Sequence, residues 1–294
     1  MPNELIVNLC PTGMIPTKDM TPHVPVEAEE IIEDILRCCD IGITMVHIHA
    51  RNSDGLPSHN PDVYARIIEG IRKYCPDLVC CVSLSGRNFK EFDKRSAPLH
   101  LTGHVKPDMG SLTLSSLNFN RIASLNSPEM IKDLAECMVE KGILPELEVF
   151  DNGMINFAIY LEKKGLIRPP HYFNLLLGNI ACAQPTMLHA GVMVNDLPTD
   201  SYWSFAGIGN AQLKMNALSI VMGGGVRVGL EDNIWYDEGR TVLATNEKLV
   251  KRIKLIADEF NRKIMKPETF REKIGLSTEK GKYGVKNEFV SKGN

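Results

Sequence analysis

The sequence has no run of apolar residues that approaches the ~20 needed to span a membrane. Its first ten residues, MPNELIVNLC, lack the basic and apolar regions of a secretory signal, so we expect a cytoplasmic protein. An excess of positive charge is also missing, because 33 Lys and Arg residues face 36 Asp and Glu residues. Nucleic acid and membranes are therefore not expected as partners, and a small molecule is.

A disulfide framework is not expected either, although the chain has eight cysteines. The pairs Cys38-Cys39 and Cys80-Cys81 are adjacent within apparent core elements, and a chain of 294 residues can bury a core without such staples. No linker or low-complexity tract interrupts the chain. We expect reduced thiols and a single domain, residues 1–294, with a tail from about residue 266 that could pack on a neighbouring subunit.

Short apolar runs alternate with longer amphipathic stretches, a pattern that predicts parallel strands with helical crossovers. Eight strands are expected, at residues 5–9, 45–50, 78–84, 110–114, 146–150, 172–177, 203–206 and 226–230. Helices are expected at 25–42, 61–74, 127–142, 155–164, 186–194, 212–222 and 246–260, with the weakest pattern at 89–101. The GxGxxG turn of a doubly wound sheet is missing after the first strand, so we predict an α/β protein with a closed (β/α)8 TIM barrel.

Enzymes with this fold carry their sites at the carboxyl-terminal ends of the strands, and the second strand ends in VHIHAR. Side chains alternate across a strand, so His47 and His49 share one side and Ile48 takes the other. Because Ile48 suits the helix layer, both imidazoles should face the barrel mouth. They are candidate metal ligands there, although an isolated HxH pair is more often surface decoration.

Glu231, at the end of the last strand, is the candidate third ligand. In a closed barrel the eighth strand lies beside the first, and the second strand lies on the other side of the first. A His2Glu set with an open position is typical of a catalytic zinc. The alternative is that GLEDN caps a loop or the next helix.

Further charged residues follow the same strands. An Asp232 kept ionised by Arg227 beside a metal could remove a proton next to a carbonyl group, and an ordinary surface salt bridge is the alternative. PELE places Glu146 and Glu148 on one face of the fifth strand, where two inward carboxylates are costly unless they bind something. Both glutamates are therefore candidate substrate-binding residues, and alternation does not decide which of the two faces the site.

Two glycines precede the helix that starts near residue 211. The stretch SFAGIGNAQ could be a plain loop. Alternatively, Gly207 and Gly209 could let backbone amides approach a phosphate of a cofactor.

The motifs VHIHAR, CVSLSG, PELEVFDNGMI, WSFAGIGNAQ and GGGVRVGLEDN, in this order, resemble the β-keto acid cleavage enzymes, typified by 3-keto-5-aminohexanoate cleavage enzyme. The resemblance extends from about residue 5 to about residue 260. It implies a zinc-dependent barrel that converts a β-keto acid and acetyl-CoA into acetoacetate and a new acyl-CoA. It also implies a homo-oligomer, a tetramer.

The resemblance assigns roles to individual residues. It implies that His47, His49 and Glu231 bind the metal and that Arg227 and Asp232 form the catalytic dyad. It further implies that Ser83 acts in catalysis and that Gly86 lines the carboxylate and keto group of the substrate.

Two departures from the aminohexanoate enzyme concern the substrate. Where that enzyme has TGAEVTKE, this chain has TGMIPTKD, so Ile15 replaces the glutamate that would bind the substrate amine. Ser116 replaces a threonine and keeps the hydroxyl. We therefore predict a keto acid without that amine, whose uncharged or apolar side chain faces Met14 and Ile15.

Two other functions are compatible with an HxH barrel. The first is a zinc-dependent hydrolase of the amidohydrolase type, but such enzymes carry HxH on the first strand and further metal histidines on strands five and six. The second is a non-catalytic barrel that binds an acyl-CoA or a keto acid. Simple binding would not require the Arg227 and Asp232 pair.

Overall fold

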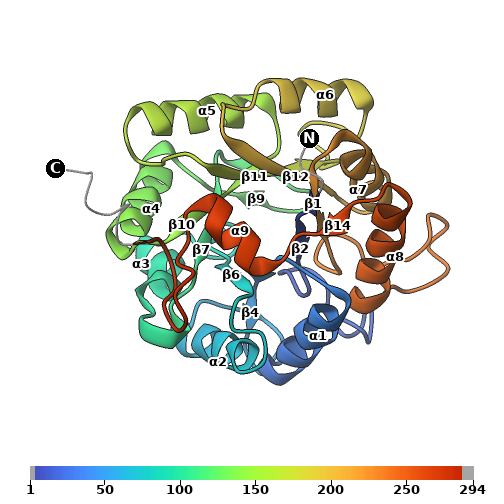
Figure 1. Ribbon diagram of the computed structural model, residues 1–294, viewed down its shortest axis with the longest axis horizontal. Helices are drawn as coiled ribbons and strands as arrows, with labels where there is room; N and C mark the ends of the chain where they lie inside the picture. Colours follow the sequence, from blue (N-terminus) through green and yellow to red (C-terminus); the bar gives the residue numbers. More distant parts are fainter. Residues whose placement is uncertain (1–3, 287–294) are drawn as a thin grey trace.

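The barrel predicted from the sequence is confirmed by the computed structural model, which describes residues 4–286. Eight parallel strands close in the order β10-β11-β12-β13-β2-β3-β6-β7 (Figure 1). Their bounds are Val7–Leu9 for β2, Met45–Ile48 for β3, Val79–Val82 for β6, Met109–Thr113 for β7, Leu144–Val149 for β10, His171–Leu177 for β11, Ser201–Gly207 for β12 and Gly225–Val228 for β13. Each expected strand overlaps one of these eight.

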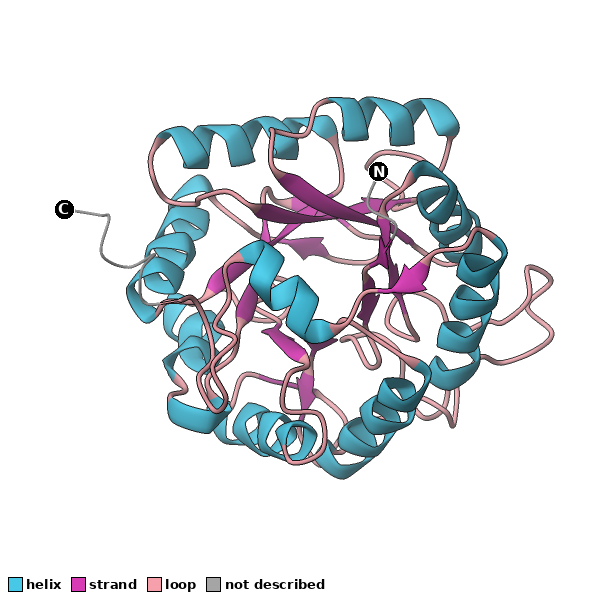
Figure 2. Ribbon diagram, in the orientation of Figure 1, coloured by secondary structure: helices cyan, strands magenta, loops and turns pink. Residues whose placement is uncertain are grey.

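Helices surround the barrel (Figure 2). They are α1 Ala28–Ile41, α2 Pro61–Arg72, α3 Phe92–Ser96, α4 Pro128–Lys141, α5 Asn152–Lys163, α6 Met187–Asn195, α7 Ala211–Met222 and α8 Asn246–Glu259. The α4 helix shows why the boundaries were predictable. The Ser127 hydroxyl caps its first turn, Pro128 occupies the first helical position, and Gly142 ends it at φ 62°.

Three short strand pairs lie outside the barrel. β1 Glu4–Leu5 pairs with β14 Lys263–Ile264, β4 Ala50–Arg51 with β5 Pro57–Ser58, and β8 Leu117–Asn118 with β9 Ala123–Ser124. The second expected strand was therefore too long, because the chain leaves the barrel after Ile48 and starts a hairpin at Ala50. The hairpins formed by β4 and β5 and by β8 and β9 follow β3 and β7 at the mouth of the barrel.

Side chains of each barrel strand divide between two cores, as the alternation predicts. On β3, Val46 and Ile48 belong to the large core between the strands and the helices. Met45, on the opposite face, belongs to a small core inside the barrel together with Cys81 and Tyr172. His47 lies on the face of Met45, so it points into the barrel.

The amino-terminal end of the barrel is covered by α9, Pro267–Ile274, which crosses it in Figure 1. Phe270 is buried, with its ring 5.5 Å from that of Tyr172, and Arg271 binds the buried carboxylate of Asp108. The expected tail from about residue 266 thus packs on its own barrel over residues 266–286, and its contact with a neighbouring subunit stays a prediction. The rest of that tail, 287–294, lies outside the described residues. Across residues 4–286, none of the helices is long and apolar enough to cross a membrane.

Candidate metal and catalytic site

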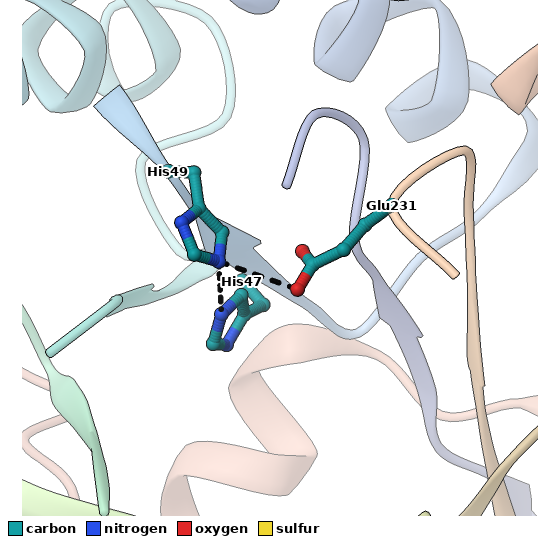
Figure 3. A group of neighbouring side chains, drawn as sticks. All are labelled: His47, His49 and Glu231. Carbon is teal, nitrogen blue, oxygen red and sulfur yellow. Dashed lines mark hydrogen bonds and ion pairs between the residues drawn. The ribbon is translucent and has the colours of Figure 1, made fainter. Parts of the chain in front are cut away.

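Three side chains from opposite ends of the sequence meet at the carboxyl-terminal mouth of the barrel (Figure 3). The Nε2 atoms of His47 and His49 lie 3.2 Å apart, and Nε2 of His49 lies 3.2 Å from Oε1 of Glu231. β2 pairs with both β3 and β13, which explains why the first and last parts of the chain share a site. The expected juxtaposition of the two histidines with Glu231 is thus present.

This trio fits a divalent metal. Two imidazole nitrogens that face each other can share either a proton or a metal ion, and the Oε2 atom of Glu231 is buried without a hydrogen-bond partner among the described residues. Two nitrogens and one carboxylate oxygen form a set that zinc accepts with a position left open. A second group, His47 with Cys81 and Glu146, fits less well, because burial and the nearby Glu146 carboxylate raise the pKa of the Cys81 thiol.

Glu146 lies below the trio and orients His47. Burial alone would lower the pKa of His47, but the Glu146 carboxylate, 2.5 Å from its Nδ1, raises it to about 9. The other carboxylate oxygen accepts hydrogen bonds from the amides of Asn8 at 2.6 Å and Asn174 at 2.7 Å. Glu146 is 0% exposed, and both of its oxygens are occupied by protein groups.

Arg227 connects the remaining carboxylates. Its Nε lies 3.1 Å from Asp232, its Nη1 3.0 Å from Glu148, and its Nη2 2.7 Å from Glu231. Burial would lower the pKa of Arg227, but the surrounding carboxylates, Asp232 first, raise it well above its ordinary value. The Arg227 guanidinium therefore stays charged and holds three acidic side chains around the metal ligands.

Asp232 has the environment of a general base. Burial raises its pKa above the ordinary range, and this effect outweighs the opposing charge of Arg227. Its Oδ2 also accepts a weak hydrogen bond from the Cys10 thiol, 3.3 Å away. A buried carboxylate with a raised pKa binds a proton more readily than an exposed one, which suits proton abstraction.

Glu148 differs from Glu146 in depth. It lies two residues closer to the mouth on β10, is 9% exposed, and accepts a hydrogen bond from Thr113 at 2.7 Å as well as from Arg227. Of the two inward glutamates, Glu148 is therefore the one that remains a candidate for contact with a substrate.

The loop after β2 carries Met14 and Ile15 over the site. Arg51, the last residue of VHIHAR, donates hydrogen bonds to the carbonyls of Gly13 at 2.9 Å and Pro16 at 3.0 Å and so holds this loop. Met14 lines a pocket shared with His49 and Ser83, whereas Ile15 is 52% exposed. Met14 therefore borders a pocket that contains a metal ligand, whereas the side chain of Ile15 is open to solvent.

The hydroxyl and glycine candidates lie in the segments that follow β6 and β7. Ser83 is buried in the same pocket as His49. Gly86 packs so closely that a Cβ would lie 2.3 Å from the Leu125 carbonyl, which explains the glycine. The exposed Ser116 accepts a hydrogen bond from the amide of Asn126 at 2.8 Å, so its hydroxyl partly stabilises this loop.

The neighbours of Gly207 and Gly209 favour the plain-loop alternative over a phosphate site. The amide of Gly209 donates to the Asp232 carbonyl at 2.8 Å, and a Cβ on Gly207 would lie 2.3 Å from the backbone of Ala211. Close packing of β12 against α7 and support of the loop that bears Asp232 account for both glycines. Their spacing could not reveal that the Gly209 amide is already used.

Other residues were missed at the sequence level. Asn8 and Asn174 lie on inward positions of the expected strands, and the alternation applied to them would have placed their amides beside Glu146. Arg51 belongs to a motif in which only the histidines were interpreted. Arg87 follows the CVSLSG motif and carried no spacing signal; its environment is described below.

Known proteins resemble this chain over most of its length. A family model described as beta-keto acid cleavage enzyme matches residues 4–276. A 3-keto-5-aminohexanoate cleavage enzyme of Fusobacterium nucleatum is 36% identical over 94% of this chain and 99% of its own. A 3-oxoadipate:acetyl-CoA acetyltransferase of Cupriavidus necator is 34% identical over 94% of this chain and 96% of its own.

A solved ternary complex of ObcA with a C4-CoA adduct and oxalate has a TM-score of 0.75 at 19% identity, covering 87% of this chain and 68% of that one. This likeness shows the barrel fold. The two sequence matches cover nearly the whole of this chain and of each relative, and they confirm the resemblance inferred from the motifs. The chain is therefore an enzyme that belongs to the β-keto acid cleavage enzyme family.

Proposed function

We propose that the protein is a zinc-dependent enzyme that condenses a β-keto acid with acetyl-CoA and releases acetoacetate and a new acyl-CoA. The observation that carries the proposal is the meeting of Nε2 of His47, Nε2 of His49 and Oε1 of Glu231 beside the ion pair of Arg227 with Asp232. A metal site adjacent to a buried base is the arrangement that proton abstraction next to a carbonyl requires.

In this proposal His47, His49 and Glu231 hold the zinc, and Glu146 fixes the ring of His47. A bound zinc supplies Lewis acidity for the keto and carboxylate oxygens of the substrate. Arg227 stays charged and keeps Glu231 oriented toward His49. Asp232 is bound by Nε of the same guanidinium, and in this proposal it reaches the substrate without binding the metal.

Asp232 removes a proton from the carbon between the carboxylate and the ketone. The resulting carbanion forms a carbon-carbon bond with the thioester carbonyl of acetyl-CoA, and the CoA thiolate leaves. That thiolate adds to the original ketone, the bond between this carbon and the former nucleophilic carbon breaks, and acetoacetate departs after protonation by Asp232. The proton removed first is returned, so no external acid is consumed.

The residues around the mouth suggest the substrate. In this proposal Ser83 and Gly86 line its carboxylate and keto group, Glu148 faces the open end, and Ser116 contributes a hydroxyl. Met14 and Ile15 supply apolar surface where a substrate amine would require an acid. We therefore propose a keto acid without the amine of 3-keto-5-aminohexanoate, with an uncharged or apolar side chain.

The test is a screen of β-keto acids with acetyl-CoA, in which free acetoacetate is measured with and without a chelator. We expect acetoacetate from acids with an apolar side chain, loss of activity after chelation, and recovery on addition of zinc. Chelator-sensitive hydrolysis of amides or lactones without acetoacetate would favour the amidohydrolase alternative. Binding of acetyl-CoA without turnover of any keto acid would favour the non-catalytic barrel.

A second arm addresses the metal directly. His49→Ala should lose bound zinc, measured by elemental analysis, while its circular dichroism stays that of the wild-type barrel. His59→Ala is the control, because His59 lines the same pocket but does not belong to the metal trio. Equal zinc content in the two variants would contradict the assignment.

We also propose a cytoplasmic homo-oligomer, a tetramer as the family resemblance implies. All eight cysteines are free, the state that a reducing compartment maintains. Helix α6 exposes the apolar side chains of Met187, Leu188 and Val192, a surface suited to contact between subunits. Light scattering of the purified protein gives the mass that decides this point.

A further inference from the structure

Arg87, in the loop after β6, is a half-buried cation whose guanidinium has no hydrogen-bond or ion-pair partner among residues 4–286. Its Nε is buried and makes no hydrogen bond. No carboxylate of residues 4–286 lies within ion-pair distance of its guanidinium. A buried N–H group that lacks an acceptor is costly, and it indicates that a ligand supplies acceptors to this guanidinium.

The other arginines at the mouth are fully engaged. Arg51 donates to three backbone carbonyls of the loops around it. Arg95 donates to the carbonyls of Leu84 and Leu125 and to the side chain of Asn126. Arg227 pairs with three carboxylates. These arginines have structural duties, and Arg87 has no comparable duty.

Arg87 is nevertheless held in place. Its guanidinium carbon lies 3.6 Å from the centre of the Phe119 ring, and Phe119 packs edge-on against the buried Phe150, with ring centres 5.8 Å apart. The Ser85 hydroxyl accepts a hydrogen bond from the Arg87 amide at 3.3 Å. Stacking on a fixed aromatic ring orients the guanidinium plane and leaves its N–H groups for an acceptor at the edge.

The position of Arg87 places it at the proposed active site. Burial lowers its pKa, and the nearby carboxylates of Glu231, Glu148 and Asp232 oppose that shift. Arg87 directly follows Gly86, which the proposed function assigns to the substrate carboxylate. The site is rich in carboxylates, while a β-keto acid and acetyl-CoA are both anions. A cation at the mouth supplies the attraction that these reactants need.

We propose that Arg87 binds an anionic oxygen group of a reactant, either the carboxylate shared by the keto acid and acetoacetate or a phosphate of CoA. This inference rests on the proposed function and adds a residue to it. The fork of N–H groups at the edge of the Phe119 platform suits both groups, because carboxylate and phosphate each accept two parallel hydrogen bonds.

Calorimetric titration of zinc-loaded protein with acetoacetate and, separately, with coenzyme A tests the inference without turnover. Arg87→Gln should raise the Kd for one of the two probes about 10- to 100-fold, as expected for loss of a charge-assisted bond. Weaker binding of acetoacetate would identify the carboxylate as the anion that Arg87 binds. Weaker binding of coenzyme A would identify the phosphate. Arg87→Lys, which keeps the charge without the fork, should restore only part of the affinity.

Arg121→Gln is the matched control, because Arg121 is an exposed arginine in the turn between β8 and β9, the hairpin that carries Phe119. Zinc content and thermal unfolding of all variants should equal those of the wild type. Wild-type affinity of Arg87→Gln for both probes would overturn the inference while leaving the proposed function intact. Failure of the wild-type protein to bind either probe would overturn both.

Discussion

Nδ1 of His47 lies 2.5 Å from the carboxylate of Glu146, which is fully buried beneath it. This bond fixes the ring so that Nε2, the opposite nitrogen, points at His49. Carboxylates that accept from a metal-binding histidine select its tautomer and its orientation. The deep position of Glu146 in the barrel therefore serves to orient a ligand of the metal site.

Glu146→Gln should weaken zinc binding about 10- to 100-fold, the usual effect of removing such a partner. The reason is that an amide at this position can donate to Nδ1 and no longer selects the tautomer that leaves Nε2 free. The measurement is a competition titration with a chromogenic chelator. Glu162→Gln serves as the control, because it breaks a similar pair with His171 at the other end of the barrel.

Equal zinc affinity in Glu146→Gln and the wild-type protein would contradict the role given to Glu146. A loss of affinity in Glu162→Gln of the same size would show that the effect is not specific to the metal site.

Much of this site could be predicted because strand alternation and barrel closure are simple rules. Alternation placed His47 and His49 on one side of β3, and closure brought Glu231 from the far end of the chain to them. Neither rule depends on the details of side-chain packing, which is why both could be applied to the sequence alone.

Alternation left two properties open: how deep a side chain lies in the barrel, and which protein groups already bind its polar atoms. Alternation assigned Glu146 and Glu148 to the same face, but it does not say how far each lies from the mouth, and Asn8 and Asn174 had not been placed beside Glu146. The amide of Gly209 looked available because its acceptor, the Asp232 carbonyl, lies 23 residues away in the sequence.

Asp232→Asn should lower kcat about 10²- to 10⁴-fold, the range typical of a lost general base. An amide keeps the size of the side chain and cannot accept the substrate proton. Zinc content should remain that of the wild-type protein, because His47, His49 and Glu231 are unchanged. Turnover of the keto acid identified by the screen is the measurement.

Asp237→Asn provides the comparison for Asp232→Asn, since Asp237 is a partly exposed aspartate in the following loop that accepts hydrogen bonds from Thr241 and Val242. Its kcat should stay within about twofold of the wild-type value, in line with a surface change. If both variants kept full activity, Asp232 would not be the base.

Gly13→Ala should both destabilise the protein and weaken zinc binding. Gly13 has φ 64°, and a Cβ there would lie 2.5 Å from Cγ of Glu231, so the ligand would have to move. Gly165→Ala separates the two effects, because Gly165 has φ 73° with no atom within 4 Å of an added Cβ. Gly165→Ala should therefore lose only about 1–3 kcal/mol of unfolding free energy, through backbone strain, and its zinc affinity should stay normal.

Urea unfolding and zinc titration of the two glycine variants give the answer. Normal zinc affinity in Gly13→Ala would mean that the loop yields rather than Glu231, and that Gly13 does not set the position of this ligand.

Asp108 links the closing helix α9 to the barrel. Its carboxylate binds Arg271 at 2.6 Å and Arg72 at 3.1 Å and is fully buried. Burial alone would raise its pKa, but the two guanidinium groups, Arg271 first, lower it below the ordinary value. Asp108→Asn leaves these cations partly unpaired and should cost about 3–5 kcal/mol of unfolding free energy at pH 7.

The dependence of this loss on pH has a definite sign. Because the pKa of Asp108 is lowered by folding, its stabilising contribution is complete above the unfolded pKa of about 3.9 and disappears as the pH falls through the folded value. Urea unfolding of the wild type and Asp108→Asn should therefore show a constant difference from pH 7 to pH 5 and a narrowing one below pH 4. Asp258→Asn, which removes an exposed partner of Lys254, should change stability by no more than about 0.5 kcal/mol at any of these pH values. A difference that instead narrowed between pH 7 and pH 5 would mean that Asp108 titrates above its ordinary range, and that α9 is not held by an ionised carboxylate.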